Sequence, residues 1–263
     1  MKDNRLTQTF ATLRARGRRA LIPYIMAGDP DPRATERLVG MLAAAGASAI
    51  ELGVPFSDPI ADGPVNQRAG LRALAHGMGV GPALEIVSRA RETTEVPLLF
   101  MTYYNLILRH GVAAFCRDAV RAGLDGLIAA DLPPEEGEEL IAEARRVGLA
   151  TVFLLAPTST DARIRAVAAA STGFIYCVSR TGVTGVQEEL PEGLAPLVAR
   201  IKAKSDTPVC VGFGISRPAQ VREVARSADG VIVGSALVQM IEDDPNDLER
   251  IEAFFRDLAA AIS

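Results

Sequence analysis

Short apolar segments alternate with longer amphipathic segments from residue 21 almost to the end of the chain. The apolar segments are rich in valine, isoleucine and leucine, which is typical of strands buried on both faces of a parallel sheet. The pattern predicts eight strands, over Leu21–Met26, Ser48–Gly53, Pro97–Met101, Gly126–Ala129, Ala150–Leu154, Phe174–Cys177, Pro208–Gly212 and Gly230–Val233.

The amphipathic segments carry apolar residues at helical spacing. They predict helices over Arg33–Ala45, Val112–Ala122, Glu136–Val147, Asp161–Ala170, Gly193–Lys204, Pro218–Arg226 and Asp244–Ser263. A leading helix, with Leu6, Phe10 and Leu13 on one face, is expected to end near Gly17. Strict alternation of strand and helix calls for parallel strands with right-handed crossovers, so the α/β pattern of this chain predicts one (β/α)8 TIM-barrel domain over residues 1–263 with an extra N-terminal helix.

Three similar turns, at residues 45–50, 122–127 and 227–232, lead from a helix into an even-numbered strand. Two explanations are open: duplicated half-barrels, or a local need for a small left-handed residue and a small polar residue in each turn. We favour the local explanation.

The charge and the hydropathy of the chain argue against nucleic acid and membranes as partners. The net charge of −4 provides no basic field for nucleic acid, and no apolar run is long enough for a membrane span. The basic first 19 residues lack the apolar core of a signal peptide. Cys116, Cys177 and Cys210 have no metal-type spacing, which predicts reduced core thiols in a cytoplasmic protein.

One acidic residue lies inside an apolar strand. Glu51 is flanked by Ile50 and Leu52, and the Pro- and Gly-rich loop that follows carries Asp58 and Asp62. TIM barrels place their active sites at the C-terminal ends of the strands, so these carboxylates form a candidate acid/base site. A buried ion pair is the structural alternative for Glu51. Asp58, like Asp29, precedes a proline and is expected in a turn or helix cap, whereas Asp62 is equally compatible with either role.

Glycine-rich segments follow the last three strands, at residues 181–185, 212–216 and 234–236. Glycines let backbone N–H groups approach an anion, and a short helix that begins at Gly234-Ser235 would add oriented donors. The sequence therefore predicts a phosphate-binding site and a phosphorylated substrate.

The residue types that the predicted strand ends lack exclude two classes of aldolase mechanism. No lysine lies at a predicted strand end, so a Schiff-base aldolase has no nucleophile. His76 and His110 do not cluster with carboxylates, and we predict no metal site. The remaining mechanism is acid/base catalysis by carboxylates.

Over essentially its whole length the chain resembles the α subunit family of tryptophan synthase. The motifs that carry the resemblance are Pro23–Pro30, Glu51–Pro64, Ala130–Pro133 with Glu135 and Glu136, Ser179–Gly185, Gly212–Ser216 and Gly234-Ser235.

The resemblance implies retro-aldol cleavage of indole-3-glycerol phosphate to indole and glyceraldehyde 3-phosphate. Glu51 matches the acid/base that protonates the indole carbon, and Asp62 matches the carboxylate that faces the indole N–H. Which group removes the glycerol hydroxyl proton stays open, because Glu51 could do both. The other implied substrate-binding residues are Tyr24, Tyr103, Tyr176, Thr184, Gly185, Phe213, Gly214, Gly234 and Ser235. Residues 179–190 match a lid.

The resemblance also implies a partner, a pyridoxal-phosphate-dependent β subunit in an α2β2 heterotetramer. This chain shows no cofactor motif of its own. The loops Pro55–Pro64 and Tyr103–Leu108 match the docking surface, with Pro55, Asp58 and Asn105 as expected contact residues. A standalone lyase of the same family is the alternative.

Two other functions compete. A phosphosugar isomerase would take acids from strands 1 and 5, but strand 5 ends in Leu154-Leu155-Ala156-Pro157. A non-catalytic activator of a β subunit is the second, and the presence of both Glu51 and Asp62 argues against it.

Overall fold

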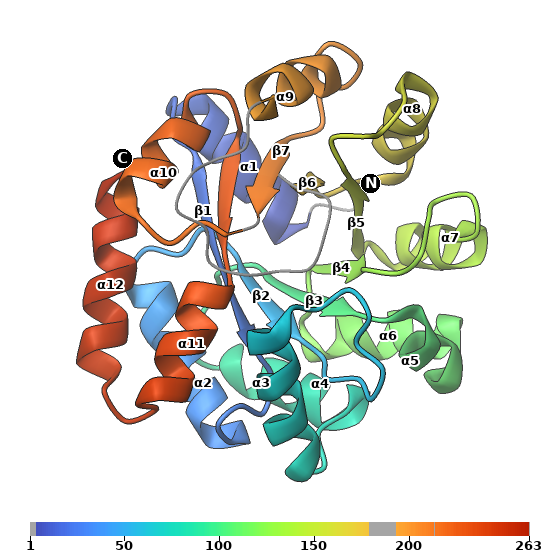
Figure 1. Cartoon of the computed structure of the whole chain (residues 1–263). Coiled ribbons are helices and arrows are strands. Elements are labelled where there is room, and N and C mark those ends of the chain that lie inside the picture. Colours follow the sequence, from blue (N-terminus) through green and yellow to red (C-terminus); the bar gives the residue numbers. More distant parts are fainter. Residues whose placement is uncertain (1–3, 179–192, 213, 263) are drawn as a thin grey trace.

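The computed structural model describes residues 4–178, 193–212 and 214–262, and within these ranges eight parallel strands close into a barrel (Figure 1). The strands are β1 (Ala20–Met26), β2 (Ile50–Gly53), β3 (Leu98–Thr102), β4 (Gly126–Ala129), β5 (Ala150–Leu155), β6 (Ile175–Val178), β7 (Val209–Gly212) and β8 (Gly230–Val233). They follow one another in sequence order, and β8 pairs with β1. The predicted TIM barrel is confirmed, with every strand end within two residues of its predicted position.

Helices surround the barrel. They are α1 (Arg5–Ala15), α2 (Pro32–Ala44), α3 (Pro64–Ala75), α4 (Val80–Ala90), α5 (Tyr104–His110), α6 (Val112–Ala122), α7 (Glu138–Val147), α8 (Asp161–Ala170), α9 (Leu194–Lys202), α10 (Pro218–Ala225), α11 (Ser235–Asp243) and α12 (Leu248–Ala260). The sequence did not predict α3 and α4, where glycines interrupt the apolar pattern. The expected loop Tyr103–Leu108 is wrong, because Tyr104–His110 is helical and Asp131 accepts a hydrogen bond from the Tyr104 N–H at 2.8 Å.

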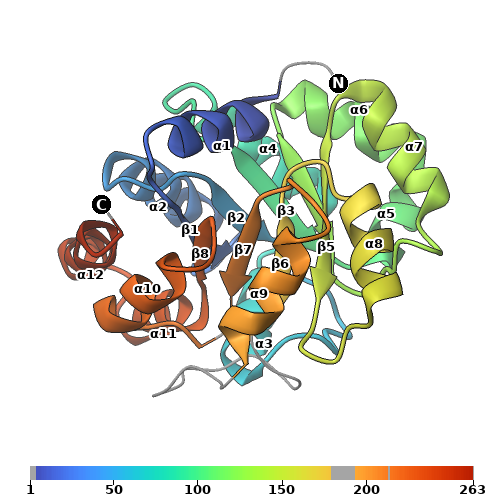
Figure 2. The same cartoon turned by 90° about the horizontal axis from the view of Figure 1, so that it is seen from above.

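The leading helix α1 closes the N-terminal end of the barrel (Figure 2). Leu6 and Phe10 are buried against residues from inside the barrel, and the Phe10 ring lies 5.8 Å from that of Phe174. The predicted apolar stripe of this helix is therefore confirmed, and it forms the floor beneath the barrel interior.

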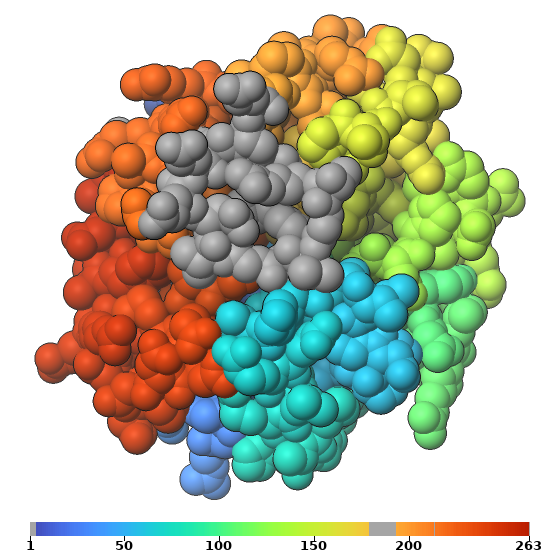
Figure 3. All heavy atoms as spheres, viewed as in Figure 1, coloured from blue at the N-terminus to red at the C-terminus, as the bar shows by residue number. Residues whose placement is uncertain are grey.

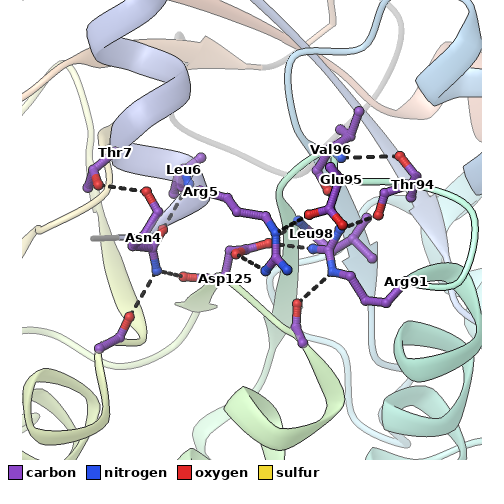
Figure 4. Close-up of polar contacts among 12 residues, drawn as sticks. Asn4, Arg5, Leu6, Thr7, Arg91, Thr94, Glu95, Val96, Leu98 and Asp125 are labelled. Atoms are coloured by element: carbon purple, nitrogen blue, oxygen red, sulfur yellow. Dashed lines mark hydrogen bonds and ion pairs between the residues drawn. The ribbon is translucent and has the colours of Figure 1, made fainter. Parts of the chain in front are cut away.

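A polar network holds α1 in this position (Figure 4). Asn4 caps the helix and also donates to the carbonyl oxygens of Asp125 and Gly148, at 2.8 and 2.9 Å. The buried Asp125 carboxylate accepts from Arg5 at 3.1 Å and forms an ion pair with Arg91. Because Asp125 lies directly before β4, the network ties α1 to the N-terminal end of the sheet.

A residue near the start of each odd-numbered strand forms two hydrogen bonds with a small polar residue that lies shortly before the following strand. That residue donates its backbone N–H to the carbonyl of the strand residue, and its side chain accepts the N–H of the same residue. The four pairs are Ser48 with Leu21, Asp125 with Leu98, Thr172 with Thr151 and Asp229 with Val209. This pairing gives each of the similar turns a reason to carry a small polar residue, which is one part of the explanation favoured above. The other part, a left-handed glycine, is present at Gly46 and Gly123, whereas the turn at residues 227–232 has no glycine before its polar residue.

Within the described ranges, no helix is long and apolar enough to cross a membrane. Cys116, Cys177 and Cys210 are buried free thiols, as predicted.

Candidate active site

Glu51 lies on β2 and is completely buried. Neither of its carboxylate oxygens has a hydrogen-bond partner among the described residues, so no residue in those ranges forms the alternative buried ion pair with Glu51. Desolvation without compensating contacts raises the pKa of Glu51 to about 8. The group is therefore mainly a neutral acid at pH 7 and can donate a proton.

Two tyrosines accompany Glu51 in the barrel interior. Tyr24 is its register partner on β1, and Tyr176 projects from β6. Burial raises the pKa of both phenols, and the charge of Glu51 raises them further, which places the carboxylate near both rings. Each hydroxyl occupies the position that a side chain would need on a neighbouring glycine: a Cβ on Gly53 would lie 2.2 Å from the Tyr24 Oη, and one on Gly212 would lie 2.3 Å from the Tyr176 Oη.

These tyrosines line a cavity at the C-terminal ends of the strands. Its described lining is formed by Tyr24, Ala61, Asn66, Met101, Ala130, Leu154, Tyr176, Val178, Gly214, Ile232, Gly234 and Ser235. Most of these side chains are apolar, which suits a flat aromatic ring. Leu154 lies on β5, where the isomerase reading would need an acid.

Asp62 lies in the loop after β2 and is 8% exposed. The Tyr103 hydroxyl donates to its Oδ2 at 3.0 Å and accepts the Ala61 N–H at 2.9 Å. Desolvation raises the pKa of Asp62, while hydrogen bonds from Tyr103 and Asn66 oppose the rise. Tyr103 thus holds both the loop and its carboxylate over the barrel mouth.

Three residues of the predicted phosphate site lie within the described ranges and line this cavity. Gly214, with a φ of +73°, joins Gly234 and Ser235 on the cavity wall. Gly234 is the N-cap of α11, and the first N–H groups of a helix have no partner inside the helix. Thr184, Gly185, Phe213 and the expected lid over residues 179–190 lie outside the described residues.

An ion-pair bridge links α3, which follows the Asp62 loop, to the C-terminal end of α11. Arg72 on α3 donates to both oxygens of Asp29, at 2.7 and 2.9 Å, and to Glu242 on α11 at 2.6 Å. Arg68 and Arg72 together lower the pKa of Glu242 to about 2. The two helices pack together on the face seen in Figure 3. Asp29 is therefore a buried ion-pair partner. It lies in a turn, as predicted, with its N–H donating to the Met26 carbonyl at 3.3 Å, whereas the alternative role as a helix cap is wrong because Asp31 caps α2.

The three expected partner contacts have different surroundings. Asp58 is exposed and accepts from the Ser57 hydroxyl at 2.6 Å, and Asn105 is exposed on α5. Pro55 is buried, so its side chain has little free surface for a partner contact in this chain.

Asn66 and Arg72 were not identified from the sequence. Asn66 follows Asp62 by four residues, and a recognised helix start at Pro64 would have placed it near that carboxylate.

A sequence model of the tryptophan synthase alpha chain matches residues 10–262. The tryptophan synthase alpha chain of Solibacter usitatus is 50% identical over 257 residues, which cover 97% of this chain and 96% of that protein. That of Geotalea uraniireducens is 48% identical and covers 98% of both chains. Among solved structures, Mycobacterium tuberculosis tryptophan synthase aligns with a TM-score of 0.92 at 41% identity over 99% of both chains. Tryptophan synthase subunit alpha from Legionella pneumophila aligns with a TM-score of 0.89 at 38% identity over 99% of this chain and 98% of that chain.

Proposed function

The chain belongs to the tryptophan synthase alpha chain family, and we propose that it uses Glu51 and Asp62 to carry out the family's reaction. It is a lyase of tryptophan biosynthesis that acts on indole-3-glycerol phosphate. The products are indole and glyceraldehyde 3-phosphate. The observation that carries the assignment of roles is Glu51, a fully buried acid that has no hydrogen-bond partner among the described residues and whose charge acts on two tyrosines of the cavity wall.

Glu51 begins as the neutral acid and protonates the indole carbon that bears the glycerol chain. The ring then carries positive charge, which Asp62 stabilises at the indole N–H. Loss of the proton from the adjacent glycerol hydroxyl forms the aldehyde, breaks the carbon–carbon bond and returns its electrons to the indole ring. Glu51, ionised by the first step, can act as the base that accepts this second proton and so returns to its neutral form.

We assign the indole ring and the phosphate of the substrate to opposite ends of the cavity. The apolar lining and the tyrosines Tyr24, Tyr103 and Tyr176 receive the indole ring. Gly214, Gly234 and Ser235 receive the phosphate, where the N-terminus of α11 favours an anion. We include Thr184, Gly185 and Phe213 in the substrate site on the family resemblance.

We further propose that the chain binds no cofactor itself and that its partner is the tryptophan synthase β subunit, which carries pyridoxal phosphate, in an α2β2 assembly. The surface near the barrel mouth supports this proposal, because Ile60 beside Asp58 and Leu108 near Asn105 are 79% and 50% exposed. Three reduced thiols are compatible with a cytoplasmic location.

The test is indole release from indole-3-glycerol phosphate by the purified chain, with and without a β subunit. We expect slow release that the β subunit accelerates. Glu51→Gln and Asp62→Asn should each abolish it, whereas Asp58→Asn, which removes an exposed acid from the same loop, should retain the rate of the isolated chain. No release from folded protein under either condition would overturn the proposal and favour a scaffold role.

A further inference from the structure

Asn66 is a polar residue in the cavity wall whose role the reaction described above leaves open. It lies in the first turn of α3 and is 6% exposed. Its Oδ1 atom is buried and has no hydrogen-bond partner among the described residues. Buried amide oxygens are almost always paired, so this one points to a partner supplied by a ligand.

The orientation of the amide follows from its neighbour. A hydrogen bond from Asn66 stabilises the ionised Asp62 carboxylate. A carboxylate only accepts hydrogen bonds, so Asn66 must present its Nδ2 donor to Asp62. The Oδ1 acceptor is then the end of the amide that is left for another group.

The position of Asn66 in the fold indicates which part of the substrate it meets. Asp62 stands at the start of α3, and α3 packs against α11, whose N-terminal residues Gly234 and Ser235 line the phosphate end. Asn66 lines the same cavity from α3, which follows Asp62 in sequence and packs against α11. The part of indole-3-glycerol phosphate between its ring and its phosphate is the glycerol chain, which carries two hydroxyl donors.

We propose that the Asn66 Oδ1 accepts a hydrogen bond from a glycerol hydroxyl of the substrate and thereby positions the chain whose carbon–carbon bond is broken. The inference rests on the proposed function, since it takes that substrate as the ligand. Asn66 is a positioning residue that orients Asp62 with one end of its amide and the substrate with the other. Its acceptor distinguishes a hydroxylated chain from one that lacks hydroxyl groups.

Binding measurements can test this without turnover. The parent is Glu51→Gln, and the second variant adds Asn66→Leu, which keeps the side-chain volume and removes the acceptor. The ligands are indole-3-glycerol phosphate and indole-3-propanol phosphate, which keeps the indole and phosphate but lacks both hydroxyls. Both variants are measured by calorimetry at pH 8, because a higher pH favours the ionised form of Asp62.

Asn66→Leu should weaken binding of indole-3-glycerol phosphate by about tenfold, since a neutral hydrogen bond to a hydroxyl is lost. Binding of indole-3-propanol phosphate should change less than about twofold, since it makes no such bond. An equal loss for both ligands would place the Asn66 contact at the indole or phosphate end and overturn the proposal. No loss for either ligand would mean that Oδ1 binds only water, and it would overturn the proposal as well.

Gln67→Leu in the same Glu51→Gln parent is the matched control. Gln67 is an exposed amide on the same helical turn, and its Nε2 donates to the Asp62 carbonyl at 2.9 Å. This change disturbs the loop without touching the cavity, so the ratio of the two affinities should stay at its parent value. A separate arm measures indole release by the unmodified chain. Failure there, with ligand discrimination intact, would count against the proposed reaction and leave the Asn66 contact standing.

Discussion

Glu51→Gln should make the protein more stable while it removes activity, and the gain in stability should grow with pH. Glutamine has nearly the volume of the neutral carboxyl group and cannot ionise. The wild-type side chain must stay protonated or carry a buried charge that has no hydrogen-bond partner among the described residues. The folded state therefore binds more protons than the unfolded state between the two pKa values of this group, and wild-type stability falls as pH rises through that window.

The magnitude follows from the two pKa values. The pKa is 4.5 in the absence of the fold and about 8 in the folded protein. Each pH unit inside this interval costs the wild type about 1.4 kcal/mol. The stability of Glu51→Gln relative to wild type should thus rise from about 1 kcal/mol at pH 5 to about 3 kcal/mol at pH 7, and it should level off at about 5 kcal/mol above pH 8. At pH 7 this corresponds to a melting temperature about 6 °C higher.

Urea unfolding at pH 5, 7 and 8.5 measures this difference directly. Glu95→Gln is the control, because Glu95 is 81% exposed and its ion pair with Arg5 lowers its pKa, so its effect should be flat over this range. A Glu51→Gln difference that is independent of pH would refute the assignment of Glu51 as a neutral buried acid. A loss of stability would show that the carboxyl group makes a contact that the fold needs.

Three further variants test other parts of the structure. Tyr103→Phe removes the hydrogen bond that lowers the pKa of Asp62, so the acid limb of the pH profile of kcat/KM should move to higher pH; an unmoved limb would mean that Asp62 is not the group that titrates there. Asp125→Ala leaves the mostly buried Arg91 without its carboxylate and should cost about 3–5 kcal/mol in urea unfolding, with indole release per folded molecule retained. Phe10→Ala removes the ring that packs on the barrel floor and should cost about 3–5 kcal/mol in the same assay; a cost below about 1 kcal/mol would show that α1 contributes little to the core.

The barrel could be predicted from the sequence because its strands are continuous apolar segments with no competing helical period. Glu51 could be predicted for the same reason, since one acid in such a segment is conspicuous. The helices α3 and α4 could not, because glycines such as Gly70 and Gly81 lie within their spans and obscure the helical pattern. The helical preference there is decided by packing against β1 and against the neighbouring helices.

The ion pair of Asp29 and the proposed role of Asn66 could not be predicted, because they depend on contacts between segments far apart in the sequence. Asp29 precedes a proline, which favours a turn, yet its side chain is bound by Arg72 from a helix 43 residues away. Asn66 was identified because its buried Oδ1 has no hydrogen-bond partner among the described residues, and this can be seen only in the folded structure. The polar residues before the even strands were visible as a weak repeat, and the reciprocal hydrogen bonds supply the physical reason for it.

The two proposed catalytic carboxylates differ in their supply of hydrogen-bond donors more than in their burial. Glu51 is fully buried and Asp62 is 8% exposed, so desolvation raises the pKa of both. Tyr103 and Asn66 direct donors at Asp62 and counteract this rise, whereas the surroundings of Glu51 offer no donor from the described residues. The donors favour the ionised form of Asp62, whereas the surroundings of Glu51 favour its neutral form. The proposed reaction uses both forms, because it needs a proton for the ring and a negative charge to stabilise the cation that results. The apolar surroundings of Glu51 therefore contribute to the proposed catalysis. A hydrogen-bond donor added there would lower the pKa of Glu51 and reduce the difference between the pKa values of Glu51 and Asp62.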